Sequence, residues 1–242
     1  MNTVGIVYSC RSVKKTMNPK TVIKISAFIF GLFASLSASA QGKTAPLIVD
    51  GLHLVPDTQL GLVYAEPGAD LSVYDKLLLI DAQVAFKKDW QRDINQNRPF
   101  HVTAGDMQNI KKEVSALFRE IFTRELQSAG FVLVSKQAPD VMIIRPAILD
   151  LNVNSPDTPR GGTTRNITES AGDMTLFLEL RDSITGDVLV KAMDFQFDRS
   201  NITPFMMDRT RNERAAHQLL TNWAQVLVNG LKETGVSTSI RP

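Results

Sequence analysis

The sequence is poor in cysteine and histidine, the residues on which many enzyme and metal sites depend. Cys10 is the only cysteine among 242 residues, so the chain cannot form an internal disulfide or a cysteine-based metal cluster. The three histidines, His53, His101 and His217, lie far apart in the sequence, and no two stand at a zinc-ligand spacing. These shortages exclude cysteine clusters and give no support to a metal enzyme.

Catalytic signatures are also missing. The sequence has no Gly-x-Ser-x-Gly elbow, no Gly-x-Gly-x-x-Gly loop and no His-Glu-x-x-His pair. Carboxylates are plentiful, but pairs such as Asp81 and Asp89 cannot be ranked without geometry. We therefore predict a protein that is not an enzyme, with no catalytic, metal-binding or cofactor-binding residues and no cofactor; a hydrolase using two carboxylates is the alternative.

The chain lacks an apolar run of the roughly 20 residues needed to span a bilayer. The run Ile25–Leu36 is shorter, follows Lys20 and Lys24, and precedes Ala38 and Ala40 at Ala-x-Ala positions. This order is typical of a secretory signal peptide, which predicts removal of residues 1–40, with Met17 as a possible true start of translation. A buried N-terminal helix or an uncleaved anchor is the alternative.

The predicted signal determines the expected location. No cysteine follows the apolar run, so we expect no lipid anchor and no transmembrane segment after cleavage. The product is expected in the periplasm of a Gram-negative bacterium, either free or loosely associated with the outer membrane.

The charge balance of the exported part differs from that of the whole chain. Residues 1–40 contain five of the 27 Lys and Arg and none of the 25 Asp and Glu, which leaves 22 cations against 25 anions. A mildly acidic body has no electrostatic footprint for nucleic acid, so we predict no nucleic-acid partner.

The stretch Gly172–Ser200 shows the clearest strand pattern. Apolar residues alternate with polar ones in both halves, and the two halves flank Asp182–Asp187, where Gly186 can take a positive φ. The pattern blurs near Val188 and Leu189, which indicates either a bulge or cover on both faces. We predict a long β-hairpin.

Two helical stripes complete the expected fold. One follows a capping-box pattern at Thr103 and Asp106 and ends before Gly130; the other carries Trp223 and several leucines. We predict an α+β two-layer sandwich, with a mostly antiparallel sheet of about five strands packed against long helices near 104–129 and 208–233. The expected organisation is a signal (1–40), an N-terminal arm (41–73) and a single domain (74–242).

Arginines form the candidate partner-binding residues. Arg209, Arg211 and Arg214 crowd the first turns of the last helix, where the helix dipole disfavours positive charge. Arg160 and Arg165 flank Gly161-Gly162 in the long polar loop 154–171, which does not have the ending of a phosphate-binding loop. The first group is either a solvated basic face or a patch for an acidic partner; the second is either an ordinary surface loop or an anion site.

Two stretches carry a family resemblance. They are Pro67–Leu77, which contains Tyr74-Asp75-Lys76, and Leu178–Leu189, which contains Arg181-Asp182-Ser183. Together they resemble a family of exported bacterial envelope proteins of unknown function, many of them described as lipoproteins, over roughly residues 60–235. The resemblance implies an envelope location and brings no catalytic residues. This chain departs from the lipoprotein members because it lacks the lipidated cysteine.

The sequence therefore favours a non-enzymatic periplasmic accessory protein that acts by contact with an envelope protein partner. A binding module for a small molecule, lipid or glycan, using the loop 154–171 and a cleft beside the sheet, is the alternative.

Overall fold

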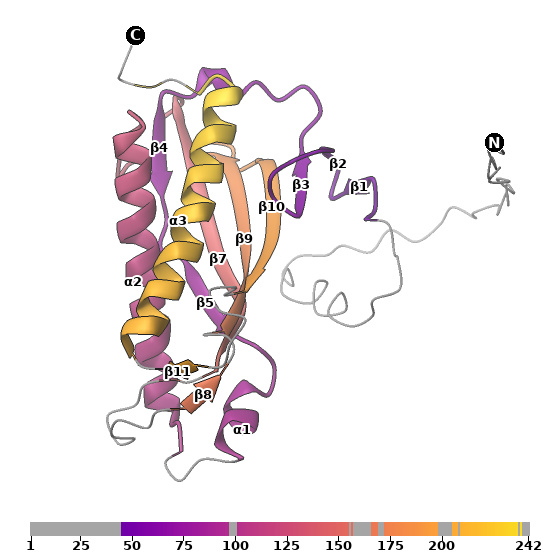
Figure 1. The fold of residues 1–242 in the computed structure, drawn as a ribbon. Coiled ribbons are helices and arrows are strands. Elements are labelled where there is room, and N and C mark those ends of the chain that lie inside the picture. Colours follow the sequence, from indigo (N-terminus) through magenta and orange to yellow (C-terminus); the bar gives the residue numbers. More distant parts are fainter. Residues whose placement is uncertain are drawn as a thin grey trace, which may run out of the picture. The chain divides into compact units, whose positions relative to one another are not determined.

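The computed structural model describes residues 45–96, 101–154, 156, 166–168, 172–197, 205–207, 209–236 and 238, and of 166–168, 205–207 and 209–211 it describes the backbone alone. Residues Ala45–Pro242 form one compact unit. Figure 1 shows a twisted sheet with two long helices on one of its faces. In the described part of the chain, no helix is both long enough and apolar enough to cross a bilayer.

The sheet has nine strands in the order β1-β2-β3-β10-β9-β7-β4-β6, and β5 pairs with β7 beyond the end of β4. The pairs of β4 with β6 and β7, and of β5 with β7, are parallel, and the others are antiparallel. The strands are β1 (Ile48–Val49), β2 (Leu52–Leu54), β3 (Leu62–Ala65), β4 (Lys76–Leu79), β5 (Gln83–Phe86), β6 (Val132–Leu133), β7 (Val141–Val153), β9 (Gly172–Asp182) and β10 (Val188–Phe197). A separate two-stranded sheet joins β8 (Asn166–Thr168) to β11 (Phe205–Met207).

The predicted α+β class is confirmed, but the predicted number of strands, about five, is wrong. Short strands account for part of the difference, because β1 and β2 are too short to show a periodic pattern. The segment from Lys76 to Phe86 also contributes two short strands, β4 and β5.

A proline explains the break between β4 and β5. The last pair of β4 with β7 is Leu79 with Ile144, and the first pair of β5 is Gln83 with Ala147. Ile80 N–H donates to the oxygen of Ile144, so the backbone of Ile144, and of Pro146 two residues later, faces this side. Pro146 has no N–H to donate on this side, and it lies in the gap where neither β4 nor β5 pairs with β7.

The predicted hairpin is confirmed as β9 and β10. Its register shifts between Val188 and Val190, so the blurred pattern near the turn comes from a bulge. Leu176, Leu178 and Leu180 of β9 lie in the main core beneath the helices.

The helices are α1 (Trp90–Asn95), α2 (Ala104–Ser128) and α3 (Arg209–Glu233), with a 3-10 turn, η1 (Leu71–Val73). Both long helices lie where the sequence placed them, whereas α1 was not predicted. The capping box of Thr103 and Asp106 at the start of α2 is present, with Thr103 N–H donating to Asp106 Oδ2 over 2.8 Å. In the second half of each long helix, large side chains are fully enclosed, among them Phe118, Phe122 and Trp223.

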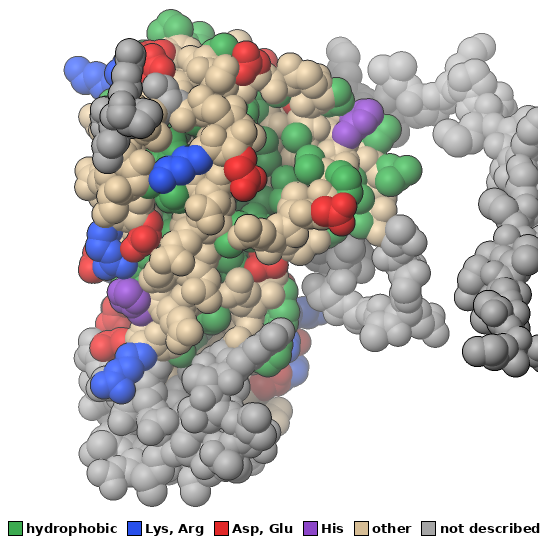
Figure 2. Space-filling view, turned by 45° about the horizontal axis from the view of Figure 1, so that its top comes forward, with side chains coloured by type: hydrophobic (Ala, Val, Ile, Leu, Met, Phe, Trp, Pro, Cys, Tyr) green, Lys and Arg blue, Asp and Glu red, His purple; other side chains and the backbone are tan. Residues whose placement is uncertain are grey.

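The N-terminal strands extend the sheet beyond β10, because β3 pairs with β10 and β2 with β3. Lys191 of β10 pairs with Asp50 in the β1–β2 turn at 2.6 Å and lies 3.9 Å from Glu179, which is itself buried and paired with Arg181. Tyr64 Oη donates to the oxygen of Pro46, which ties β3 to the segment just before β1. Figure 2 shows hydrophobic side chains gathered over the β1–β3 region, where Leu47 and Ile48 are exposed.

Candidate functional site

A groove of about 990 Å³ lies between the first halves of α2 and α3. The two helices run in the same direction, so their N-terminal halves lie at one end of the sheet (Figure 1). The ends of β7 and β9 form the floor through Leu151, Val153 and Met174. The groove is therefore bounded by two helices and the sheet beneath them.

A gradient of burial along both helices produces this groove. In the first half of α2, Ile110, Val114 and Leu117 are half-buried, whereas Ile121 and Phe122 further along are fully buried. The same change occurs along α3, where Ala216 and Leu219 are half-buried, but Leu220 and Trp223 are enclosed. The apolar stripes thus continue past the point where the helices stop covering each other, which leaves apolar surface accessible in the groove.

The two walls of the groove differ in charge. The charged side chains that line the groove from α2 are all carboxylates, namely Asp106, Glu113 and Glu120. The α3 wall is mixed and includes Glu213, Arg214 and His217. His217 Nδ1 lies 3.3 Å from Thr221 Oγ1, one turn further along the helix.

A close approach of backbone shapes the floor. Gly172 begins β9 with φ +153°, and a Cβ at this position would stand 2.0 Å from the oxygen of Asn152 in β7. Asn152 Nδ2 also donates to Asp173 Oδ2 over 2.7 Å. Only glycine permits this contact, which brings β7 and β9 together beneath the groove.

The structure locates only some of the predicted arginines. Arg214 is exposed and lines the groove. Arg209 and Arg211 lie in α3, but their side chains are outside the described residues, as are Arg160 and Arg165 altogether. From the loop 154–171, Pro156 lines the groove, and most of the rest is not described.

Sequence reasoning missed the acidic wall. Asp106, Glu113 and Glu120 follow each other in steps of seven, a spacing that keeps side chains on one line of a helix. That spacing was a usable signal, although the sequence did not show that this line borders an open groove.

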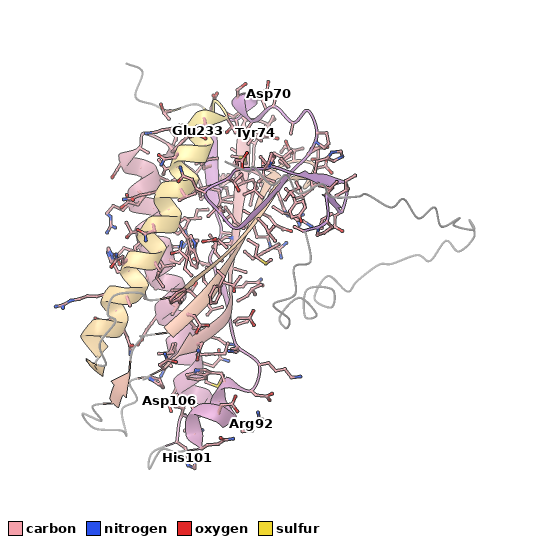
Figure 3. The ribbon with its side chains drawn as sticks, turned by 45° about the vertical axis from the view of Figure 1, so that its right-hand side comes forward. Asp70, Tyr74, Arg92, His101, Asp106 and Glu233 are labelled. Atoms are coloured by element: carbon pink, nitrogen blue, oxygen red, sulfur yellow. The ribbon has the colours of Figure 1, made fainter. Side chains whose placement is uncertain are left out.

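The two stretches behind the family resemblance meet at the opposite end of the domain. Tyr74 Oη donates to Asp182 Oδ2 over 2.8 Å, and Asp182 Oδ1 accepts from the backbone N–H groups of Ile184 and Thr185, both at 2.7 Å. Ser183 Oγ donates to the oxygen of Ala138 over 2.7 Å. Figure 3 places Tyr74 and Asp106 at opposite ends, so these residues form a structural junction and do not border the groove.

The electrostatics of this junction follow from burial and hydrogen bonding. Burial, reinforced by the bond to Asp182, raises the pKa of Tyr74 to about 12. The backbone N–H of Thr185, together with Tyr74 and Ile184, lowers the pKa of Asp182. Nearby, the ion pair between Lys76 and Asp140 raises the pKa of Lys76 and lowers that of Asp140.

Metal chemistry finds no support in the described part of the chain. No group of three or more His, Cys, Asp or Glu side chains there is arranged to hold a metal ion. The groove instead offers apolar contact with charged walls, which suits the binding of another molecule.

The fold and the groove define an α+β protein with one helical layer. The chain belongs to the family described as protein of unknown function (DUF3313), whose profile matches residues 51–227. This match confirms the resemblance inferred from the two sequence stretches. No curated protein matches the sequence.

Solved structures with a related arrangement come from several bacteria. The PelC dodecamer from Paraburkholderia phytofirmans is 14% identical, with 68% of this chain and 95% of that chain covered and a TM-score of 0.35. A minor lipoprotein from Acinetobacter baumannii is 12% identical, with 69% and 99% covered and a TM-score of 0.34. Protein XCC0632 from Xanthomonas campestris is 16% identical, with 74% and 94% covered and a TM-score of 0.37.

Proposed function

We propose that this chain is an exported, non-enzymatic protein of the bacterial envelope that binds a protein partner in the groove between α2 and α3. The observation that carries the proposal is the run of half-buried apolar residues on both walls, in particular Val114 and Leu117 of α2 and Leu219 of α3. Apolar surface left accessible between two otherwise well-packed helices is typical of a binding site.

The proposed location rests on the predicted signal peptide. The charged, apolar and small-residue order of residues 20–40 supports export, and the periplasm is the expected compartment.

Site-specific photo-crosslinking in intact cells tests the binding site. Gln218 and Gln225 are exposed glutamines one heptad apart on α3, but only Gln218 lines the groove. A photoreactive residue at 218 should capture a discrete envelope protein, and the same residue at 225 should capture it far less. Fractionation of the same cells identifies the compartment. Equal capture at both positions, or recovery of the protein in the cytoplasm, would contradict the proposal.

A small apolar ligand is the second candidate for the groove. Its volume of about 990 Å³ lies at the upper end of the roughly 300–1,000 Å³ found for ligand sites. Native mass spectrometry of the purified protein should then show a bound lipid or other small molecule that is lost when Ala116, an exposed residue of the groove, is replaced by tryptophan. An unliganded mass for the wild-type protein would favour the protein partner.

A further inference from the structure

The acidic residues on the α2 wall form a regular line. Asp106, Glu113 and Glu120 are separated by seven residues each, which corresponds to about 10.5 Å along the helix axis for each step. Asp106 accepts hydrogen bonds from Thr103 in the helix cap, and the side chains of Glu113 and Glu120 are exposed at the groove. A molecule in the groove therefore meets carboxylates at a fixed interval along this wall.

The apolar residues beside this line follow the heptad pattern of a coiled coil. Met107, Ile110, Val114, Leu117 and Ile121 are spaced by three and four residues, as the a and d positions of a heptad are. In the same register the three carboxylates occupy the g position, which in coiled coils faces the charged flank of a partner helix. The first half of α2 thus has the pattern of a helix seam with an acidic edge.

Resting on the proposed function, we infer that the groove takes an amphipathic helix of a partner protein, with Lys or Arg along the flank that faces α2. The apolar face of this helix packs against Ile110, Val114 and Leu117, and its cations pair with Glu113 and Glu120. The α3 wall, with Arg214 and His217 beside Glu213, has mixed charge, so the cations lie on one side of the partner helix.

The spacing favours a helix over an extended segment. Every seventh residue of a helix returns to nearly the same face, so its cations can follow the carboxylates one for one. An extended strand covers about 10 Å in three residues, and an odd number of residues moves the side chain to the opposite face. The carboxylates also disfavour the surface of an anionic membrane, which attracts basic segments.

Two synthetic peptides provide the test against the full chain purified from the envelope fraction of the cells that export it. Each has about three heptads with Leu at a and d; one has Lys at e and g, and the other has Glu there. Fluorescence anisotropy should show binding of the Lys peptide and weaker binding of the Glu peptide. The change Glu120→Lys should weaken binding of the Lys peptide about three- to tenfold, because it removes one ion pair and adds one repulsion between like charges. Combined with Glu113→Lys, it should strengthen binding of the Glu peptide.

Glu233 provides the matched control, because it is an exposed glutamate on a long helix at the far end of the domain from Asp106 (Figure 3). Glu233→Lys should leave both affinities unchanged. The inferred charge of the partner is wrong if Glu120→Lys and Glu233→Lys change the peptide affinities equally. It is also wrong if the Glu peptide binds as tightly as the Lys peptide.

Two further variants separate this outcome from failure of the groove itself. Leu117→Ser changes the apolar α2 wall of the groove, and Ala116→Trp adds bulk at an exposed position of the same helix, where the replacement is compatible with folding. Weaker binding of both peptides in both variants, with no charge effect, would retain the groove and overturn the cationic helix. If neither variant alters binding of the Lys peptide, both the groove as a binding site and the cationic partner helix are overturned. Equal or tighter binding to phosphatidylglycerol vesicles, blocked by Ala116→Trp, would assign the groove to a membrane surface and also overturn the inference.

Discussion

Tyr74 donates a hydrogen bond of 2.8 Å to Asp182, a residue 108 positions later in the chain. The bond joins the turn before β4 to the turn of the β9–β10 hairpin, and the two stretches that carry the family resemblance meet there. Their contribution is to fix the end of the sheet opposite the groove.

Replacing Tyr74 by phenylalanine should lower the free energy of unfolding by about 1.5–3 kcal/mol, because the bond ends on a charged carboxylate and is partly buried. Urea denaturation followed by circular dichroism measures the change. Tyr64→Phe is the matched control, since it removes a bond to the neutral oxygen of Pro46 and should cost only about 0.5–1.5 kcal/mol. A Tyr74→Phe variant as stable as the wild type would show that the junction contributes no stability.

The same tyrosine predicts a dependence of stability on alkaline pH. The folded-state pKa of about 12 lies above the ordinary value of about 10, so the contribution of Tyr74 is complete below pH 10 and is lost as pH rises toward 12. Asp182 acts at the other end of the scale: its pKa is lowered, so its contribution is present above the ordinary carboxyl pKa and is lost as pH falls through the folded-state value. The difference in melting temperature between wild type and Tyr74→Phe should shrink between about pH 10 and 12. A constant difference over that range would contradict this assignment.

Two glycines should respond to alanine with opposite signs. Gly172→Ala should destabilise the protein by about 2–4 kcal/mol, because the new Cβ would collide with the oxygen of Asn152. Gly230 lies in α3 with nothing within 4 Å of a Cβ, so Gly230→Ala should stabilise by about 0.5–1 kcal/mol. Thermal unfolding of the two variants measures these changes in stability. An alanine at 172 without loss of stability would show that β7 and β9 are further apart at this point.

The arginines at the start of α3 provide a prediction about partners. If Arg209, Arg211 and Arg214 form a patch for an acidic protein, changing all three to glutamine should remove cross-linked species from intact envelopes. If they form a solvated basic face, the cross-links should remain. Replacing Lys232 and Arg119, which lie outside the groove, by glutamine serves as the comparison for loss of positive charge.

Local signals in the sequence were sufficient for several elements and insufficient for others. Thr103 and Asp106 predicted the start of α2, and alternation predicted the hairpin, because both patterns come from neighbouring residues. The break between β4 and β5 depends on Pro146, which lies in a different strand, so the pattern of residues 77–86 alone could not show it.

The groove depends even more on distant contacts. Val114 and Leu117 read from sequence as ordinary core positions, and their partial burial appears only when α3 is packed beside α2. The sequence could have supplied the line through Glu113 and Glu120, since a step of seven is visible in one helix. The position of Arg214 in the first turns of α3 made it a candidate from sequence. In the structure it shares the groove with the carboxylates of α2, which the sequence pattern of α3 does not show.

The register of β3 has a consequence for the order of folding. Ala65 pairs with Val190, so β3, which can pair with β2 at once, finds its second partner strand only when β10 has been made. Contacts between residues this distant form late, because the chain between them must first be closed into a loop. During synthesis, β3 and β4 therefore emerge well before the strands that complete the sheet, and the apolar side chains of Leu77 and Leu79, which are buried in the folded protein, are exposed during this interval. The newly made chain should accordingly need protection from aggregation until its β9–β10 hairpin has been made.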